Sequence, residues 1–480
     1  MSARAARAAP ALASAALLAL AAWAWIRYPV APTYDSLASL VWGRDVLAGR
    51  MPAFDGFHAP TEHPLWLALS VLLAPLGEQA GRGMTLVTVL ALVALAVGTY
   101  RLGARVFGPA AGVVAAALLL TRLNFGFYAA FGFLDVPFVA LVIWAAALEA
   151  ERPRRGRIVW VLLVAAGLLR PEAWVMAGAY ALWLGGPPAA IVRRGVLVAL
   201  APVLWALTDL VVTGNPLFSF TYTTDAASDL GRTRGLLHLP ESVYGALREV
   251  LKPPVLAAGI AGLVLALRRG SPSRTDLVLL GTGALGLLTF CALVVGGVSA
   301  QVPRYAAVLA VVLLVYAGHL VATGGRLVLA ARRGVALAAV AVLATAGGLL
   351  ATRLHPASAA SELRFRVAVE RDLAAALRTP AVRRARACGP IAVPTHKLLP
   401  VTRWLVGGRE DRVIARSDLD ERRRPGVVLL PQGFRLLHNA AYGSFTAGVG
   451  APAAVTQRVP SELRFRGRSP GRRFAIYTRC

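Results

Sequence analysis

The sequence predicts an α-helical polytopic membrane protein with about eleven transmembrane helices and a C-terminal soluble α/β domain. The first reason is composition: 57% of the 480 residues are hydrophobic and only 16% are charged, a balance that soluble domains rarely show. The second is that several apolar runs exceed the roughly 18 residues needed to cross the hydrocarbon core of a bilayer. The third is a change after residue 353 to short apolar stretches separated by glycine and proline.

The expected spans coincide with the apolar runs. The run at 9–26 comes after two arginines, so a cleaved signal peptide is the alternative, but Trp23 and Trp25 at its end suit a retained span that meets the membrane interface. The run at 64–76 is bracketed by Pro64 and Pro75 and is short, so we expect a helix that lies at the interface. The other expected spans are 84–104, 109–123, 133–150, 158–169, 172–186, 195–213, 253–268, 277–298, 305–325 and 335–352.

Arginines set the expected orientation. The net charge is +27, and arginines gather in short loops such as 151–157 and 268–274. Because basic loops stay on the cytoplasmic side, we expect a multi-pass protein of the cell membrane with a cytoplasmic N-terminus. An odd number of spans then places the C-terminal domain outside the cytoplasm. The interruption of 158–186 at Pro171 is the weakest point, because a single span there would reverse the orientation of every later loop unless the run at 64–76 also crosses the membrane. Arginines in short loops also account for the positive net charge, so the charge is no reason to expect nucleic-acid binding.

The expected domain boundary lies between a membrane domain at 1–352, with a first extracytoplasmic loop at 27–83, and an α/β domain at 353–480. In the latter, residues 371–387 fit an amphipathic helix, and "IAVP", "GVVLLP" and "FAIYTR" fit buried strands. Cys388 and Cys480 fall in this domain, and an oxidising compartment would make them a candidate disulfide. Cys291 lies in a span and is expected to be an apolar filler.

Ionisable side chains show where chemistry could occur. On this topology no acid lies at mid-bilayer, where a transporter would more often place polar groups. They lie instead at the outer ends of spans, which indicates a reaction site at the outer membrane surface. Transfer of a sugar from a polyprenyl phosphate needs one carboxylate as a base and arginines that stabilise the departing phosphate. The residues in question are Asp35, Asp135, Glu172, Asp209, Arg170 and Arg304.

Five stretches carry a resemblance to a known family. They are "PTYDSLASLVWGRDVLAGRMP", "PTEHPLWLALSVLLAPLG", "GLLRPEAWVMAGAYALWL", "TGNPLFSFTYT" and "VPRYAAVLAVVLL". In this order they resemble the GT-C superfamily of membrane glycosyltransferases, which includes protein O-mannosyltransferases and actinobacterial mannosyl- and arabinosyltransferases. The resemblance covers about residues 1–330. It implies an inverting glycosyltransferase that uses a lipid-phosphate sugar, either hexose or pentose.

The resemblance assigns roles to particular residues. Asp35, the first acid after the first span, matches the family's catalytic position. Glu172 is the second catalytic candidate. Many members carry paired acids at the first position, whereas Ser36 comes directly after Asp35 here. No paired-acid motif therefore supports a divalent metal, and metal dependence stays open. The expected substrate-binding residues are Arg170, Arg304, Tyr305, His63, Asp135 and Asp209.

Structural roles compete with these assignments. Glu172 could only neutralise Arg170 at a helix break, and Asp135 could be a helix N-cap ahead of Pro137. Asp209 could be a satisfied polar group at a helix end. His58 and His63 could bind a metal with Glu62, but no ligand spacing supports this and turn residues fit better. Asp45 fits a salt-bridged residue on an interface helix better than a catalytic acid.

The predicted function is transfer of a sugar from a polyprenyl-phosphate donor to a cell-envelope glycan, lipid or protein. One alternative is a transporter or flippase of lipid-linked glycans, which needs a polar path through the spans. The other is a non-catalytic envelope scaffold, which would not require Asp35. Membrane lipid is the expected surrounding partner, and nucleic acid is not an expected one.

Overall fold

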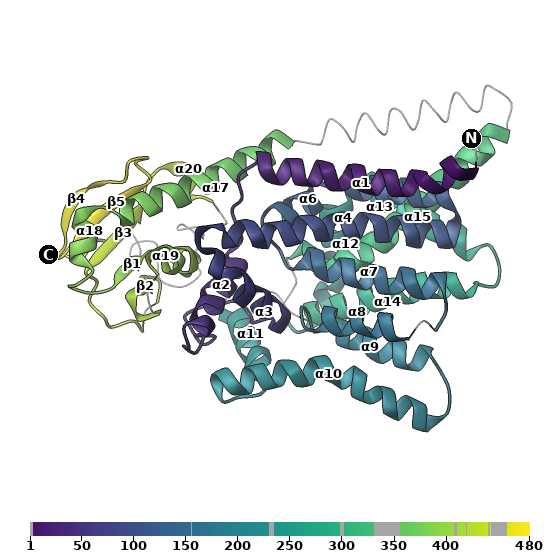
Figure 1. Ribbon diagram of the computed structural model, residues 1–480, viewed down its shortest axis with the longest axis horizontal. Coiled ribbons are helices and arrows are strands. Elements are labelled where there is room, and N and C mark those ends of the chain that lie inside the picture. The colour runs from purple at the N-terminus through teal and green to yellow at the C-terminus, as the bar shows by residue number, and fades with distance from the viewer. Residues whose placement is uncertain are drawn as a thin grey trace. The chain divides into compact units, whose positions relative to one another are not determined.

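The chain forms two compact units, each assembled from separate stretches of sequence. The computed structural model describes residues 3–154, 156–229, 235–297, 302–330, 356–407, 410–418, 420–439, 442 and 458–480. The first unit comprises Met1–Tyr28, Thr85–Trp205 and Arg232–Ala359, and the second comprises Pro29–Met84, Ala206–Gly231 and Ala360–Cys480. Figure 1 traces the chain through both units by colour.

The first unit is helical in its described residues. Each apolar run expected there forms a helix, except the run at 335–352, which lies outside the described residues. The helices that lie wholly or mainly in this unit are α1 (Ala3–Arg27), α4 (Ala80–Phe107), α5 (Pro109–Leu120), α6 (Leu123–Ala130), α7 (Asp135–Glu151), α8 (Arg157–Gly167), α9 (Glu172–Trp183), α10 (Pro188–Thr213), η2 (Leu236–His238), α12 (Leu239–Leu251), α13 (Pro253–Leu267), α14 (Arg274–Val295), η3 (Pro303–Ala306) and α15 (Ala307–Ala330).

The expected number of spans is not reached in the described residues. Four helical stretches there are long and apolar enough to cross a membrane: Pro64–Phe107, Pro188–Thr213, Arg274–Val295 and Pro303–Gly325. The count rises to six if each of two bent pairs, α5 with α6 and η2–α12 with α13, is one span. The expectation of about eleven spans, which rested on apolar length, is therefore wrong for this part of the chain. The first of the four stretches also includes the run at 64–76 that we expected at the interface.

Helix length explains much of the difference. α8 has 11 residues and α9 has 12, so at about 1.5 Å per residue each is much shorter than the roughly 30 Å thickness of the hydrocarbon core. The chain between them passes through Arg170 and Pro171, where an ion-pair cluster interrupts the helix. α7 has 17 residues and carries Asp135 at its start and Glu149 and Glu151 at its end. α7, α8, α9 and α14 lie side by side in one part of the bundle (Figure 1).

The second unit combines a five-stranded sheet with short helices. Its helices are α2 (Tyr34–Leu47), α3 (Pro64–Leu73), η1 (Ala74–Gln79), α11 (Phe218–Asp229), α17 (Pro356–Leu377), α18 (Pro380–Ala385), η4 (His396–Leu398), α19 (Leu399–Val406), η5 (Glu410–Arg412) and α20 (Phe434–Leu437). Its strands are β1 (Ile391–Val393), β2 (Val413–Ala415), β3 (Val427–Pro431), β4 (Arg464–Arg468) and β5 (Phe474–Thr478).

Strand order is β2-β1-β3-β5-β4. β1 pairs in parallel with β2 and β3, whereas β5 is antiparallel to both β3 and β4. The three strands expected from "IAVP", "GVVLLP" and "FAIYTR" are therefore β1, β3 and β5. β2 and β4 were not foreseen: β2 has only three residues, and β4 is a mostly exposed edge strand rich in arginine.

Alternating side chains give the sheet two buried faces. Ile391 and Val393 of β1 point into a core shared with α17 and α19, whereas Ala392 points into a smaller core on the opposite face. β3 shows the same alternation, as a period of two requires. The expected helix at 371–387 is broken in the structure, because α17 ends at Leu377 and Thr379 caps a new helix that starts at Pro380.

A disulfide closes this unit. Cys388 precedes β1 and Cys480 comes after β5, and the structure joins them across a Cα–Cα distance of 6.6 Å.

Leu37 of α2 and Phe57 pack in the same core as the sheet. The compact unit is therefore larger than the domain expected at 353–480, because it also takes in residues 29–84 and 206–231.

Candidate functional site

An ion-pair cluster lies in the first unit, where two helices begin. Asp135 is the first residue of α7 and Glu172 is the first residue of α9. Arg170 donates from Nη1 to Asp135 Oδ1 and from Nε to Glu172 Oε1 at 2.8 Å. Carboxylates at helix N-termini are stabilised by the backbone dipole. One guanidinium therefore ties the starts of two helices together.

The turn η3 adds a second arginine to this cluster. Pro303 opens the turn, and Arg304 Nε lies 3.3 Å from Asp135 Oδ2. The ring of Tyr305 lies 4.0 Å from the guanidinium carbon of Arg170, and the guanidinium of Arg304 lies 4.9 Å from the ring of Phe133. Two arginines and two carboxylates balance in charge, and aromatic rings cover the arginines, which favours cations by the cation–π effect.

The two arginines differ in exposure. The side chain of Arg170 is 9% exposed, whereas that of Arg304 is 24% exposed. Burial lowers the pKa of Arg170, but the charges of Glu172 and Asp135 outweigh it and raise the pKa above its ordinary value. Arg170 is thus paired with two carboxylates inside the unit, whereas part of the Arg304 side chain is exposed.

Glu172 keeps one acceptor position open. Its Oε1 accepts from Arg170, but its Oε2 is buried and has no hydrogen-bond partner among the residues that the structure describes. A buried carboxylate oxygen without a hydrogen-bond donor lowers the stability of the folded protein, so its presence needs an explanation. A substrate hydroxyl or a water molecule would satisfy it.

Asp35 belongs to the second unit and lies in the first turn of α2. Thr33 caps the helix by accepting a hydrogen bond from the Ser36 backbone N–H at 3.3 Å. Ser39 Oγ donates to the carbonyl oxygen of Asp35 at 3.1 Å. Asp35 is half-buried. The sequence folds this way because the threonine side chain satisfies one of the first backbone donors of the helix.

Aromatic and basic side chains surround the start of α2. Tyr34 donates to the carbonyl oxygen of His58, and its ring packs edge-on against that of His396 with centroids 5.7 Å apart. Lys397 Nζ lies 4.6 Å from the Tyr34 ring centroid. Burial, and to a smaller extent the charges of Lys397 and His58, lowers the pKa of His396 to about 2, so the ring is uncharged. One positive charge, on Lys397, therefore lies next to the residue that precedes Asp35.

Two buried acids lie elsewhere in the second unit. Asp209 is fully buried and accepts from the backbone N–H and Oγ of Ser219 at 2.9 and 2.8 Å. Glu62 is 2% exposed, and neither of its carboxylate oxygens has a hydrogen-bond partner among the described residues. Burial and then the charge of Asp209 raise the pKa of Glu62 well above its ordinary value, which favours its neutral form. His63 is half-buried at the start of α3.

The structure therefore divides the expected site residues into two sets. Asp135, Arg170, Glu172, Arg304 and Tyr305 form one cluster in the first unit. The other set, Asp35, His63 and Asp209, belongs to the second unit. Asp45 is salt-bridged to Arg50, in line with the structural role preferred for it.

Sequence reasoning missed several residues near these groups. His396 and Lys397 beside Tyr34 were not foreseen, although Lys397 is one of two lysines in the chain, and that rarity is a signal that could have found it. Nothing in the sequence marks Glu62 as a buried acid. Within the described ranges, no group of three or more histidines, cysteines or acids could hold a metal ion.

Comparison with known proteins identifies the fold. No family model matches the sequence, and no curated protein matches it at a significant level. Among solved structures, the chain is similar to the crystal structure of ArnT from Cupriavidus metallidurans in the apo state, with a TM-score of 0.56 and 15% sequence identity. The match covers 97% of this chain and 97% of that chain.

The likeness defines the class of architecture. ArnT is a GT-C glycosyltransferase, and this chain shares its fold from end to end. The chain thus has the ArnT fold with a C-terminal sheet. Its described helices include stretches long and apolar enough to cross a membrane. No sequence-family match supports the actinobacterial mannosyl- or arabinosyltransferase subtype.

Proposed function

We propose that this protein is a glycosyltransferase of the GT-C type that moves a sugar from a polyprenyl-phosphate donor to a cell-envelope glycan, lipid or protein at the outer membrane face. The observation that carries the proposal is the end-to-end likeness to ArnT, which acts on a lipid-linked sugar. The first acid after the first long apolar helix, Asp35, supports it by position. The balanced cluster around Arg170 supports it by chemistry.

The reaction can be written from these groups. Asp35 removes the proton of the acceptor hydroxyl while the hydroxyl oxygen attacks the anomeric carbon of the donor sugar. The bond from that carbon to the phosphate oxygen breaks, and polyprenyl phosphate leaves with the bonding electron pair. Attack opposite the leaving group inverts the anomeric centre. The donor sugar is a hexose such as mannose or a pentose such as arabinose.

The phosphate role falls to Arg304 rather than to both arginines. Arg170 is buried and paired with two carboxylates. If it bound a phosphate instead, Asp135 and Glu172 would be left as buried, unpaired charges. Arg304 lies 3.3 Å from Asp135, and its side chain is 24% exposed, more than that of Arg170. Arginine suits phosphate because its planar donors match the phosphate oxygens. Asp135 and Tyr305 then hold the two arginines in place.

Further substrate-contact candidates lie in each unit: Glu172 in the first, and His63 and Asp209 in the second. The open Oε2 of Glu172 is assigned to a donor-sugar hydroxyl, which would supply the hydrogen bond that this buried oxygen lacks. His63 and Asp209 are kept as substrate-binding candidates in the same unit as Asp35. Asp209 already accepts two hydrogen bonds from Ser219. We therefore assign it the role of holding the start of α11 in place.

The substitution Arg304→Gln tests the phosphate role. We expect the protein to fold, because the residue is partly exposed, and to bind polyprenyl phosphate at least about tenfold more weakly, since a charge-assisted bond to phosphate contributes about 1.5–3 kcal/mol. Binding is measured by titration of purified protein with polyprenyl phosphate. Arg248→Gln on the exposed face of α12 is the control and should leave the dissociation constant unchanged. Equal affinity in Arg304→Gln and wild type would remove Arg304 from the site.

Orientation is tested by thiol labelling in whole cells. We propose a cytoplasmic N-terminus and an extracytoplasmic C-terminal domain, in agreement with the arginine-rich loops. In a Cys291→Ser background, which removes the free cysteine, a cysteine replacing the exposed Ser461 should react with an impermeant maleimide in intact cells. A cysteine replacing the exposed Arg157 should react only after lysis. The reverse pattern would invert the topology and exclude an outer-face reaction.

A further inference from the structure

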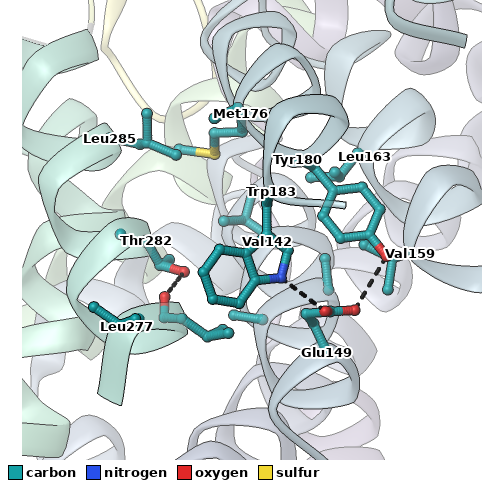
Figure 2. Close-up of a pocket in the computed structure, with 15 residues that line it drawn as sticks. Val142, Glu149, Val159, Leu163, Met176, Tyr180, Trp183, Leu277, Thr282 and Leu285 are labelled. Carbon is teal, nitrogen blue, oxygen red and sulfur yellow. Dashed lines mark hydrogen bonds between the residues drawn. The ribbon is translucent and has the colours of Figure 1, made fainter. Parts of the chain in front are cut away.

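A slot in the first unit lies apart from the Arg170 cluster of the same unit. It has a volume of about 170 Å³ and is partly open. Four helices, α7, α8, α9 and α14, supply its walls, as Figure 2 shows. Asp135 is at one end of α7 and Glu149 is near the other, 14 residues along the helix, which separates them by roughly 21 Å. The slot contains none of the residues assigned to sugar transfer.

One end of the slot is apolar. Val142, Leu163, Met176 and Leu285 line it from all four helices. Along α7 the lining runs from Val142 to Glu149, which is roughly 10 Å of helix. Ligand pockets for drug-sized molecules usually have volumes of about 300–1,000 Å³, so this slot is too small for one. Its small volume and apolar walls fit a single hydrocarbon chain.

The other end is polar and firmly built. Glu149 is 3% exposed, and its Oε1 accepts from Trp183 Nε1 and from the Arg154 backbone N–H, both at 2.8 Å. Its Oε2 accepts from Tyr180 Oη at 3.1 Å, and that hydroxyl accepts in turn from the Gly156 backbone N–H at 3.1 Å. Two of these side-chain bonds are drawn in Figure 2. The carboxylate therefore fixes the aromatic wall and the α7–α8 loop.

Positive charge gathers at this polar end. The guanidinium of Arg274 lies 5.1 Å from the Trp183 ring, and Arg194 donates to the Gly185 carbonyl just after α9 at 2.6 Å. Three acids at this end have partners within the protein. Glu149 accepts from Trp183, Tyr180 and Arg154, Glu151 pairs with Arg101 at 2.6 Å, and Asp276 forms a capping box with Ser273. Exposed arginines in the α7–α8 and α13–α14 connections and at the first residues of α8 and α14 are Arg152, Arg154, Arg157, Arg268, Arg269 and Arg274.

We propose that the slot binds one acyl chain of an anionic phospholipid whose phosphate headgroup is held by Arg274 and Arg154. An apolar channel that ends among exposed arginines is complementary to a molecule with a hydrocarbon chain and a negative head. Each methylene removed from water contributes to binding, and each arginine near an anionic headgroup adds about 1 kcal/mol, or about fivefold in affinity. The leucine that opens the slot, Leu277, is 42% exposed, which leaves a path for the chain.

Filling the slot tests where the chain binds. A Cβ at Gly281 would meet no atom within 4 Å, so Gly281→Leu places a side chain in the slot. We expect the dissociation constant for phosphatidylglycerol, measured by native mass spectrometry of the purified full-length protein, to rise at least tenfold. Gly178→Leu is the matched control: its Cβ position is equally open, but the residue does not line the slot, so binding should change less than twofold. Ala179→Leu fills the slot from the opposite wall and should repeat the Gly281→Leu result.

Removing charge at the mouth tests the headgroup. Two arginines at about fivefold each should make wild type bind phosphatidylglycerol about 25-fold more tightly than phosphatidylcholine with the same chains. Arg274→Gln should lower this preference to about fivefold. Arg274 is exposed, so this variant is expected to fold even if the slot-filling variants do not. Equal binding of both lipids by wild type, or an unchanged preference in Arg274→Gln, would overturn the headgroup assignment. Normal phosphatidylglycerol binding by folded Gly281→Leu would overturn the slot.

Discussion

Asp35→Asn is expected to lower turnover about 100- to 10,000-fold, the range that a positioned general base contributes. Asparagine keeps the size of the side chain and leaves the Thr33 cap and the Ser39 contact to the backbone intact, but it cannot take the proton of an acceptor hydroxyl. The protein should therefore fold normally and bind polyprenyl phosphate with unchanged affinity. The measurement is release of polyprenyl phosphate from polyprenyl-phosphate mannose and from polyprenyl-phosphate arabinose, in membranes that supply the acceptor.

Asp55→Asn provides the matched control for this result. It makes the same change in the same expected extracytoplasmic loop, at an exposed position, and turnover should stay within about twofold, as for most surface substitutions. If Asp35→Asn released polyprenyl phosphate at a near-normal rate, the base would have to be sought at Glu172, Asp135 or Asp209. If neither donor were consumed by wild type, the proposed function itself would be in question.

Arg170→Gln should destabilise the protein by about 3–5 kcal/mol, the cost of removing one partner from a buried ion pair. The substitution would leave Asp135 and Glu172 buried without the guanidinium that now pairs with both of them. The starts of α7 and α9 would also lose their common donor. The measurement is the midpoint of thermal unfolding in detergent, monitored through tryptophan fluorescence.

Two further variants separate charge from packing in this prediction. Arg170→Gln combined with Glu172→Gln leaves one arginine and one carboxylate, so it should recover part of the lost stability. Arg50→Gln breaks a pair that is 39% exposed on the arginine side and should cost no more than about 1 kcal/mol. A double variant less stable than Arg170→Gln alone would show that lost packing against Tyr305, rather than unbalanced charge, dominates.

The sequence predicted the helices better than their number across a membrane. Apolar runs mark buried or lipid-facing helices, and the described runs do form helices. Length alone does not separate a spanning helix from one inside a bundle. The run from 158 to 186 illustrates the limit, because Arg170 and Pro171 divide it into two helices too short to cross alone. The bends at α5–α6 and α12–α13, of 59° and 109°, are tertiary features that periodicity does not reveal.

The candidate site was predictable as a set of residue types but not as a geometry. Acids at the starts of helices can be recognised from flanking prolines, as at Asp135 and Glu172. That Arg170 bridges them could not be foreseen, because Asp135 is 35 residues away in sequence. The same holds for Lys397 beside Tyr34, a contact that depends on the short helix η4 lying next to the start of α2. Contacts of this range depend on the whole fold rather than on a local pattern.

The core that Leu37 shares with the sheet has a consequence for biogenesis. Arg44 of α2 donates to the backbone carbonyls of Trp404, 360 residues later, and of Arg403. The ribosome makes α2 long before the sheet. The apolar side chains of α2 that belong to this core therefore have no packing partner until the intervening helices have been synthesised. Folding that depends on such distant partners is slow, and exposed apolar segments aggregate in the meantime. Assembly of this unit therefore comes after membrane insertion, so a sheet produced alone would lack part of its own interior.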